Sequence, residues 1–390
     1  MFTNSLRSLL VIIIVLSFAN CKQNNFEVNI AKIDHDRIIS AADKYLLEEP
    51  VTITSTIAER SAGGIHDFYS EGDYWWPDTE NPDSPYVRRD GMTNPENFTA
   101  HRKAMVRLSI QVATLAAAYK ITGNIKYADK VIEHIKAWFV NDETRMNPNL
   151  LYAQAIKGRF TGRGIGIIDT IHLVEVVQAI IVLEKAGVIN KDDIAAIKNW
   201  FADYLTWMTT HQYGIDERNN GNNHSTCWAI QVAEFAKLTG NDEQLNFCRK
   251  MFTDTLIPDQ MAKDGSFPKE LERTKPYGYA LFNLDAMTTL CQIISDDENN
   301  YWNFNTPDGR NMKKAVEFMY PFIKDKSTWT YQQDVMYWDD WPVRQPSLLF
   351  AGINYEEQKY IDLWKTLNPD PDKEEIIRNY PIRQPVLWVN

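Results

Sequence analysis

Apolar positions recur at helical spacing along most of the chain beyond residue 95. The segment 96–121 shows this most clearly, because its apolar residues fall three or four positions apart, at Met105, Val106, Leu108, Val112, Leu115 and Ala116. Side chains with that spacing lie on one face of an α-helix, so an amphipathic helix is predicted here. Similar patterns predict helices over 33–48, 279–295, 310–323 and 356–366.

The central helices are predicted to pair into antiparallel hairpins around Gly123, Gly187 and Gly240. The paired segments are 96–121 with 125–140, 173–185 with 192–208, and 228–238 with 245–256. A glycine just after a helix adopts the conformation that ends it, and a short connection then returns the next helix. The hairpins lack the short regular period of a solenoid. We therefore predict an all-α fold, an (α/α) toroid or incomplete barrel of αα-hairpins.

Two long segments lack helical periodicity. Residues 61–98 form a polar and aromatic insert, and residues 326–350 contain a second aromatic stretch. Loops of this length inside a compact domain are usually functional, so they are expected to lie over the cleft of the toroid. No linker composition divides the chain, and residues 25–390 are predicted to form a single toroid domain.

Composition and charge narrow the classes of ligand. The chain carries 41 Lys and Arg against 52 Asp and Glu, a net charge of −11, which argues against a nucleic-acid-binding protein. Aromatic residues make up 12% of the chain, with 12 Trp and 18 Tyr, and such side chains suit flat, partly apolar sugar rings. An anionic ligand would need a local cluster of arginines.

The N-terminus predicts export. Residues 8–19 are an apolar run that follows Arg7 and is too short to span a bilayer. Residues 1–20 are therefore predicted to be a signal peptide, and Cys21 is the candidate for lipid acylation in a periplasmic or outer-membrane lipoprotein, with an ordinary secretory signal as the alternative. The spacing of Cys227, Cys248 and Cys291 fits neither a disulfide framework nor a zinc site, so these three are expected to be buried.

An asparagine-rich segment supplies the first candidate chemistry. In residues 219–225 four asparagines surround Gly221 and precede His224. Asn222 or Asn223 can cap the following helix, whose N-terminus favours a bound carboxylate, and histidine transfers protons near neutral pH. A cap without chemical function explains this segment equally well.

Residues 267–279 supply the second group of candidate catalytic residues. Pro276 and Gly278 predict a bend that leads into the helix at 279–295. Arg273 can pair with a carboxylate and is expected to lower the pKa of a neighbouring tyrosine. Surface arginine and packing tyrosines are the alternative interpretation.

The insert interleaves aromatic residues with arginines between Gly63 and Gly91. Rings stack on sugar faces and guanidinium groups pair with carboxylates, so this pattern suits an acidic carbohydrate, although the aromatics can also simply anchor the loop. The acids that begin at Asp73 do not follow an EF-hand pattern, and a metal is not favoured.

Together these segments resemble a known family. Asn222-Asn223-His224-Ser225-Thr226-Cys227-Trp228 resembles the Asn-Asn-His-Ser-x-x-Trp motif of alginate-lyase-like polysaccharide lyases. Residues 267–279 resemble the second active-site segment of these enzymes, and the insert looks like that of exported members. The resemblance covers roughly residues 60–350, and it is closest to polysaccharide lyase family 38 and more distant from family 5.

The resemblance implies an (α/α) toroid that cleaves uronic-acid polymers by β-elimination without a metal or other cofactor. It places Asn223, His224 and Arg273 around the uronate carboxylate and makes Tyr279 the proton-transferring group, with Tyr277 as the alternative. The residues expected to bind substrate are Tyr69, Trp75, Trp76, Arg88, Arg89, Arg163, Tyr277 and Arg344.

The chemistry suits these residue types. The C5 proton lies next to a carboxylate, whose charge must be neutralised before that proton can leave. A tyrosine then acts as base, and also as acid when the C5 proton and the leaving oxygen lie on one face; if they lie on opposite faces, His224 is the expected base.

Alginate is the favoured substrate and glucuronan the alternative. A toroid hydrolase would need two opposed carboxylates, and the sequence shows no such pairing. A surface lipoprotein that only binds acidic glycans would explain the aromatic residues but not the four candidate catalytic residues. The expected partner is thus an acidic polysaccharide, with no nucleic acid and with membrane contact only through a lipid anchor.

Overall fold

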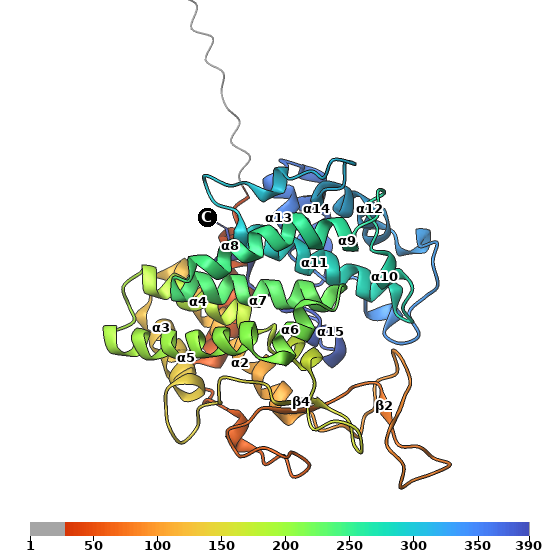
Figure 1. Ribbon diagram of the computed structural model, residues 1–390. Coiled ribbons are helices and arrows are strands. Elements are labelled where there is room, and N and C mark those ends of the chain that lie inside the picture. Colours follow the sequence, from red (N-terminus) through yellow and green to blue (C-terminus); the bar gives the residue numbers. More distant parts are fainter. Residues whose placement is uncertain (1–27, 390) are drawn as a thin grey trace, which may run out of the picture.

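The computed structural model describes residues 28–389 (Figure 1). The predicted signal peptide and Cys21 lie outside the described residues. Within these residues no single helix is long and apolar enough to cross a membrane; one bent pair, Gly164–Thr170 with Leu173–Lys185, passes that test by length and composition alone.

The predicted helices are present, with ends that shift by a few residues. They are α1 (Ile30–Tyr45), α2 (Ala100–Thr122), α3 (Ile125–Phe139), α4 (Leu173–Lys185), α5 (Lys191–Thr210), α7 (Asn223–Thr239), α8 (Asp242–Met251), α11 (Pro276–Ile294), α12 (Met312–Lys324) and α14 (Gln358–Thr366).

The first and third hairpins are confirmed, because α2 packs against α3 and α7 against α8. The second is wrong as a packed pair: α4 packs mainly against α2 and α7, and α5 packs mainly against α7. Gly123 and Gly240 adopt left-handed conformations, with φ of 68° and 71°, directly after α2 and α7. The returning helices begin at asparagine caps: the side chain of Asn124 accepts from the N–H of Lys126, and that of Asn241 accepts from the N–H of Gln244. These local signals account for why helices form and stop at these positions.

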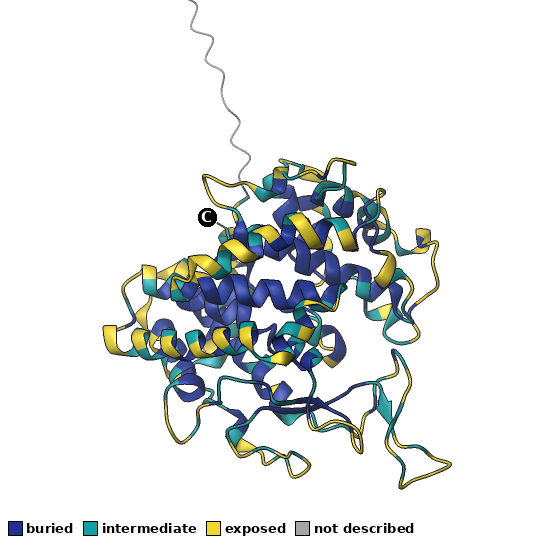
Figure 2. Cartoon of the chain, in the orientation of Figure 1, coloured by how far each residue is buried: buried dark blue, intermediate teal, exposed yellow. Residues whose placement is uncertain are grey.

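The helices form two layers, an (α/α) toroid. Helix α7 packs against α4, α5, α8 and α11, and α2 packs against α3 and α4. Figure 2 shows α7 and α11 buried along most of their length, whereas α5 and α8 expose one face. Residues from Ile30 to Trp388 contribute to one hydrophobic core, in which the three cysteines are buried and free, as expected.

Five short helices were not predicted. They are α6 (Gln212–Arg218), α9 (Ile257–Gln260), α10 (Pro268–Leu271), α13 (Ser347–Asn354) and α15 (Glu374–Arg378). Each has eight residues or fewer, which is too short for a periodic pattern to stand out. The predicted bend at 276–278 is wrong, because α11 begins at Pro276; proline is tolerated in the first turn, where its missing N–H needs no partner.

The insert over 61–98 is free of helix, as predicted. Its strand β1 (Tyr69–Glu71) pairs in parallel with β4 (Tyr152–Ala155), and β2 (Trp75–Trp76) pairs antiparallel with β3 (Val87–Arg88). Figure 1 shows these strands and their loops below the helical body, facing the N-terminal end of α7. This arrangement brings the insert and the helix ends to one cavity.

Candidate active site

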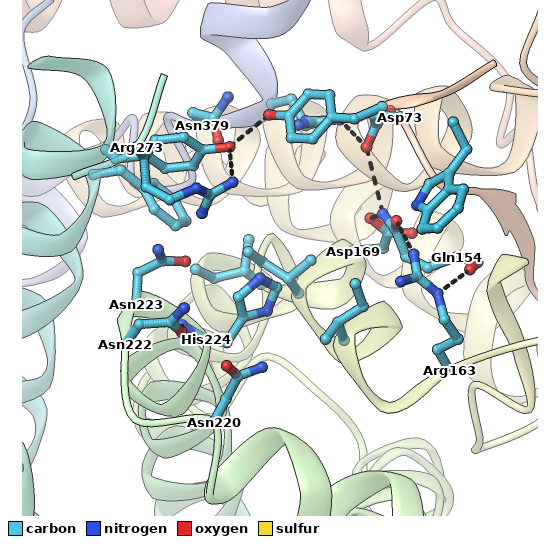
Figure 3. Close-up of a pocket in the computed structure, with 18 of the residues that line it drawn as sticks. Asp73, Gln154, Arg163, Asp169, Asn220, Asn222, Asn223, His224, Arg273 and Asn379 are labelled. Carbon is cyan, nitrogen blue, oxygen red and sulfur yellow. Dashed lines mark hydrogen bonds and ion pairs between the residues drawn. The ribbon is translucent and has the colours of Figure 1, made fainter. Parts of the chain in front are cut away.

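A cavity of about 310 Å³ lies between the insert and the helical body. Asn223 and His224 at the start of α7 line it together with Arg273 and Tyr279. In Figure 3 Arg273 and Asn379 lie at the top, Asn222 and Asn223 lie below Arg273, and His224 lies beside these two asparagines. The two sequence segments therefore meet at one site, as the predicted chemistry requires.

The α7 N-terminus is held by side-chain hydrogen bonds. Asn222 caps the helix by accepting from the N–H of His224 at 3.0 Å. The backbone N–H and the Nδ2 group of Asn223 donate to the two carboxylate oxygens of Glu270, at 2.8 and 2.7 Å. Burial raises the pKa of Glu270, although the bonds from Asn223 oppose this. Glu270 on α10 thus orients Asn223, which lies only 1% exposed.

His224 is paired with a buried carboxylate that sequence reasoning missed. Its Nδ1 lies 2.7 Å from Oε1 of Glu217, a residue of α6 that is fully buried. Burial alone would lower the pKa of His224, but the charge and hydrogen bond of Glu217 outweigh it and raise the pKa. The other ring nitrogen, Nε2, is left for the cavity.

Arg273 is bound to the insert. Its Nε and Nη2 groups donate to the two oxygens of Asp90 at 3.2 and 2.9 Å, and Nη2 also donates to the hydroxyl of Tyr279 at 3.1 Å. Burial opposes the charge of Arg273, but Tyr279 and Asp90 raise its pKa further, so it stays charged. Nη1 is the nitrogen without a bond to these partners.

The hydroxyl of Tyr279 contacts two side chains, Tyr74 and Arg273. Its oxygen lies 2.7 Å from the hydroxyl of Tyr74, which belongs to the insert, and it accepts from Arg273. The expected lowering of its pKa is wrong: burial, reinforced by Tyr74, raises the pKa well above the ordinary value, although Lys275 and Arg273 oppose this. Tyr279 is therefore a neutral phenol in the free protein at pH 7.

The far end of the cavity carries the predicted aromatic and basic residues Trp75, Arg88 and Arg163. The hydrogen bonds of Arg163 go to the carbonyl of Gln154 at 2.8 Å and to its side-chain oxygen at 3.4 Å, rather than to a carboxylate of the described chain. Burial, followed by the nearby charge of Arg88, lowers the pKa of Arg163 to about 10. It remains a cation that contacts no carboxylate directly among residues 28–389, although Asp169, Asp73 and Glu217 lie near enough to favour its charge.

Five residues expected to bind substrate do not line this cavity. Tyr277 is fully buried and donates to the carbonyl of Phe322 at 3.0 Å. Arg344 is buried in an ion pair with Asp34 at 2.6 Å. The other three are held by partners of the insert: Tyr69 donates to Glu71, Trp76 donates to the carbonyl of Met92, and Arg89 stacks on Trp76.

Two acids line the cavity wall, and both are committed to arginines. Asp73 pairs with Arg102 at 2.7 Å and with Arg378 at 2.6 Å, while Asp169 lies 3.3 Å from Arg102. Burial opposes the charge of Asp73, but the two arginines hold its pKa far below the ordinary value. Such a carboxylate cannot serve as the general acid of a hydrolase. Among residues 28–389 no cluster of three or more His, Cys, Asp or Glu side chains could hold a metal ion.

Comparisons with known proteins agree with this geometry. The sequence matches the alginate lyase family over residues 52–329. The chain is similar to the crystal structure of an alginate lyase from Bacteroides ovatus, with 31% identity, a TM-score of 0.78, and coverage of 90% of this chain and 93% of that one. No curated protein sequence matches the chain.

Two more distant structures share the fold. Alginate lyase A1-III from Sphingomonas species A1 is 13% identical, with a TM-score of 0.58 and coverage of 90% of this chain and 94% of that one. A variant of alginate lyase A1-III complexed with a tetrasaccharide is 14% identical, with a TM-score of 0.59 and coverage of 94% and 98%.

Proposed function

The chain belongs to the alginate lyase family and is a polysaccharide lyase, and from this premise we propose that it cleaves alginate by β-elimination. Each cut would leave a 4,5-unsaturated uronate at one new chain end. The observation that carries the proposal is that Asn223, His224, Arg273 and Tyr279 line one cavity. Membership of polysaccharide lyase family 38 and export as a lipoprotein are further parts of this proposal.

The first task of the site is to neutralise the uronate carboxylate. The Nη1 group of Arg273 and the second amide hydrogen of Asn223 converge on the cavity from two sides, and His224 adds a donor at Nε2 when its ring is protonated. Preorganised donors of this kind stabilise the negative charge that grows on the carboxylate as the C5 proton leaves. These side chains supply the charge that the reaction needs, so the proposed elimination uses no metal or organic cofactor.

The second task is proton transfer. The C5–H bond breaks, its electron pair forms the C4=C5 double bond, and the C4–O bond breaks, so the leaving oxygen must receive a proton. Neutral Tyr279 is equipped to give that proton. The face of the sugar that carries the C5 proton decides which group accepts it: Tyr279, in its phenolate form, takes a proton from the face of the leaving oxygen, and Nε2 of His224 takes one from the opposite face.

The test is an assay with a panel of polyuronates. The C4=C5 bond conjugated with the carboxylate absorbs ultraviolet light, so growth of this band on alginate is the expected result. If the band grows only on glucuronan, glucuronan and not alginate is the substrate. New reducing ends without the band would indicate hydrolysis, and binding without either product would indicate a glycan-binding protein; both outcomes contradict the proposal.

Arg163 is expected to hold a neighbouring uronate of the polymer. Because Arg163 does not touch the reacting sugar, Arg163→Ala should weaken the binding of the substrate and of the transition state equally. It should therefore raise KM about tenfold and leave kcat nearly unchanged. Steady-state kinetics on the polymer measures this. Arg89→Ala is the control, since Arg89 is exposed and lies outside the cavity. A fall in kcat without a rise in KM would contradict the assignment of Arg163.

A further inference from the structure

Glu217 is a buried carboxylate whose only side-chain partner in the described chain is His224. One oxygen, Oε1, lies 2.7 Å from Nδ1 of His224, and the other, Oε2, has no hydrogen-bond partner among residues 28–389. Moving a charge out of water costs free energy unless the charge is paired. A contribution to the stability of the fold therefore does not explain a fully buried glutamate that leaves one carboxylate oxygen without a hydrogen bond.

The surrounding structure holds this carboxylate in place. Helix α6, which carries Glu217, packs against the 3₁₀ helix η2 (Gly164–Thr170) and against α7. The hydroxyl of Tyr213 on α6 donates to the carbonyl of Gly162 at 2.9 Å, and the hydroxyl of Ser225 on α7 donates to the backbone carbonyl of Glu217 at 3.3 Å. Both ends of the Glu217–His224 contact are therefore fixed by neighbouring elements.

We infer that Glu217 is a positioning residue, which keeps the proton of His224 on Nδ1 and turns Nε2 toward the substrate. The carboxylate can only accept a hydrogen bond, so Nδ1 must donate to it. An imidazole that lost this partner would be free to rotate and to exchange tautomers. For catalysis this inference rests on the proposed function, because it assigns Nε2 to contact with the uronate.

Glu217 also sets the charge state of His224. The charged groups that face His224 are Glu217 from α6, Glu270 from α10 and Arg273 from the segment before α11. Glu217 and Glu270 favour the protonated ring and Arg273 disfavours it, and Glu217 has the largest effect of the three. Removing the Glu217 charge should therefore lower the pKa of His224.

The direct test is nuclear magnetic resonance of protein labelled with ¹⁵N at histidine, with His224→Gln used to assign the signal. In the wild type, at a pH above the pKa of His224, we expect a neutral ring protonated on Nδ1. In Glu217→Gln the pKa of His224 should fall by about one unit or more. Glu217→Asp keeps the charge but shortens the side chain, so its pKa should stay closer to that of the wild type. The same tautomer and the same pKa in all three proteins would overturn the inference.

The kinetic test uses the pH dependence of kcat/KM. On a polymer whose C5 proton faces Nε2, His224 is the base, and the acidic limb of this profile follows the pKa of His224, the lower of the two pKa values in the site. Glu217→Gln should move this limb to lower pH and reduce the maximal rate, whereas a purely structural role would reduce the amount of active enzyme without moving the limb. Glu234→Gln is the matched control, because Glu234 is a fully buried glutamate on α7 that does not line the cavity.

The two tests separate the inference from the proposed function. A protein without lyase activity would contradict the proposed function, yet the resonance measurement would still decide whether Glu217 sets the tautomer and the pKa of His224. An active enzyme with an unmoved acidic limb would contradict the role of Glu217 alone.

Discussion

Replacing Tyr279 with phenylalanine is expected to lower kcat for elimination by about 10³-fold and to leave the fold intact. Loss of a positioned proton-transfer group typically costs between about 10² and 10⁴ in rate. The ring of Tyr279, on which Arg273 stacks with its guanidinium carbon 4.3 Å from the ring centroid, would remain. Only the hydroxyl that reaches Tyr74 and Arg273 would be lost. Continuous absorbance of the unsaturated product measures the rate, and circular dichroism checks the fold.

Tyr277→Phe is the matched control, because it removes the same atom from a residue two positions earlier in α11. The hydroxyl of Tyr277 donates to the carbonyl of Phe322 in the core, so its loss should lower the free energy of unfolding by about 1 kcal/mol. Activity should stay at the wild-type level. An active Tyr279→Phe enzyme, or an inactive but folded Tyr277→Phe enzyme, would contradict the assignment of the proton-transfer group.

The choice between these tyrosines depends on where α11 begins. Successive residues of an α-helix are rotated by about 100°, so residues two positions apart point in nearly opposite directions. A helix that starts at Pro276 therefore turns Tyr279 to the cavity and Tyr277 to the core. The sequence pattern predicts a helix start at Tyr279, because proline and glycine indicate a bend before it. With that start, the preference for Tyr279 depends only on its position at the beginning of the helix, and Tyr277 stays open as the alternative.

Local signals predicted the fold and one half of the site. Apolar periodicity and glycine stops located the helices and two of the three hairpins, and the asparagine cap placed Asn223 and His224 at the tip of α7. The partners of these residues could not be found in this way, because they come from distant segments. Asp90 lies 183 positions before Arg273, and Arg344, expected at the substrate, is paired with Asp34 from α1.

Electrostatics was the other feature that the sequence could not predict. Arg273 lies next to Tyr279, as expected, and it does favour the phenolate. Burial of the hydroxyl opposes this more strongly, and burial depends on how the insert covers the cavity. The sequence can indicate which groups are neighbours, but the sign of a pKa shift requires the packing around them.

Arg273→Ala is the second substitution expected to remove most of the activity, lowering kcat/KM by about 10²- to 10³-fold. The arginine supplies positive charge for the uronate carboxylate and a hydrogen bond to the oxygen of Tyr279. Arg273 also compensates the negative charge of Asp90. Partial burial would raise the pKa of Asp90, but Arg273 and Arg88 together lower it to about 2. Removing Arg273 therefore leaves a less compensated negative charge beside the place where an anionic substrate must bind.

A double substitution separates these effects. In Arg273→Ala combined with Asp90→Asn the repulsion from Asp90 is gone, so KM should recover while kcat stays low, because the donor to Tyr279 and to the carboxylate is still missing. Asp90→Asn alone should keep most of the activity, since Arg273 retains its charge and its contact with Tyr279. Full recovery of kcat in the double variant would mean that Arg273 serves only to neutralise Asp90, and the proposed contact between Arg273 and the uronate would then have to be abandoned.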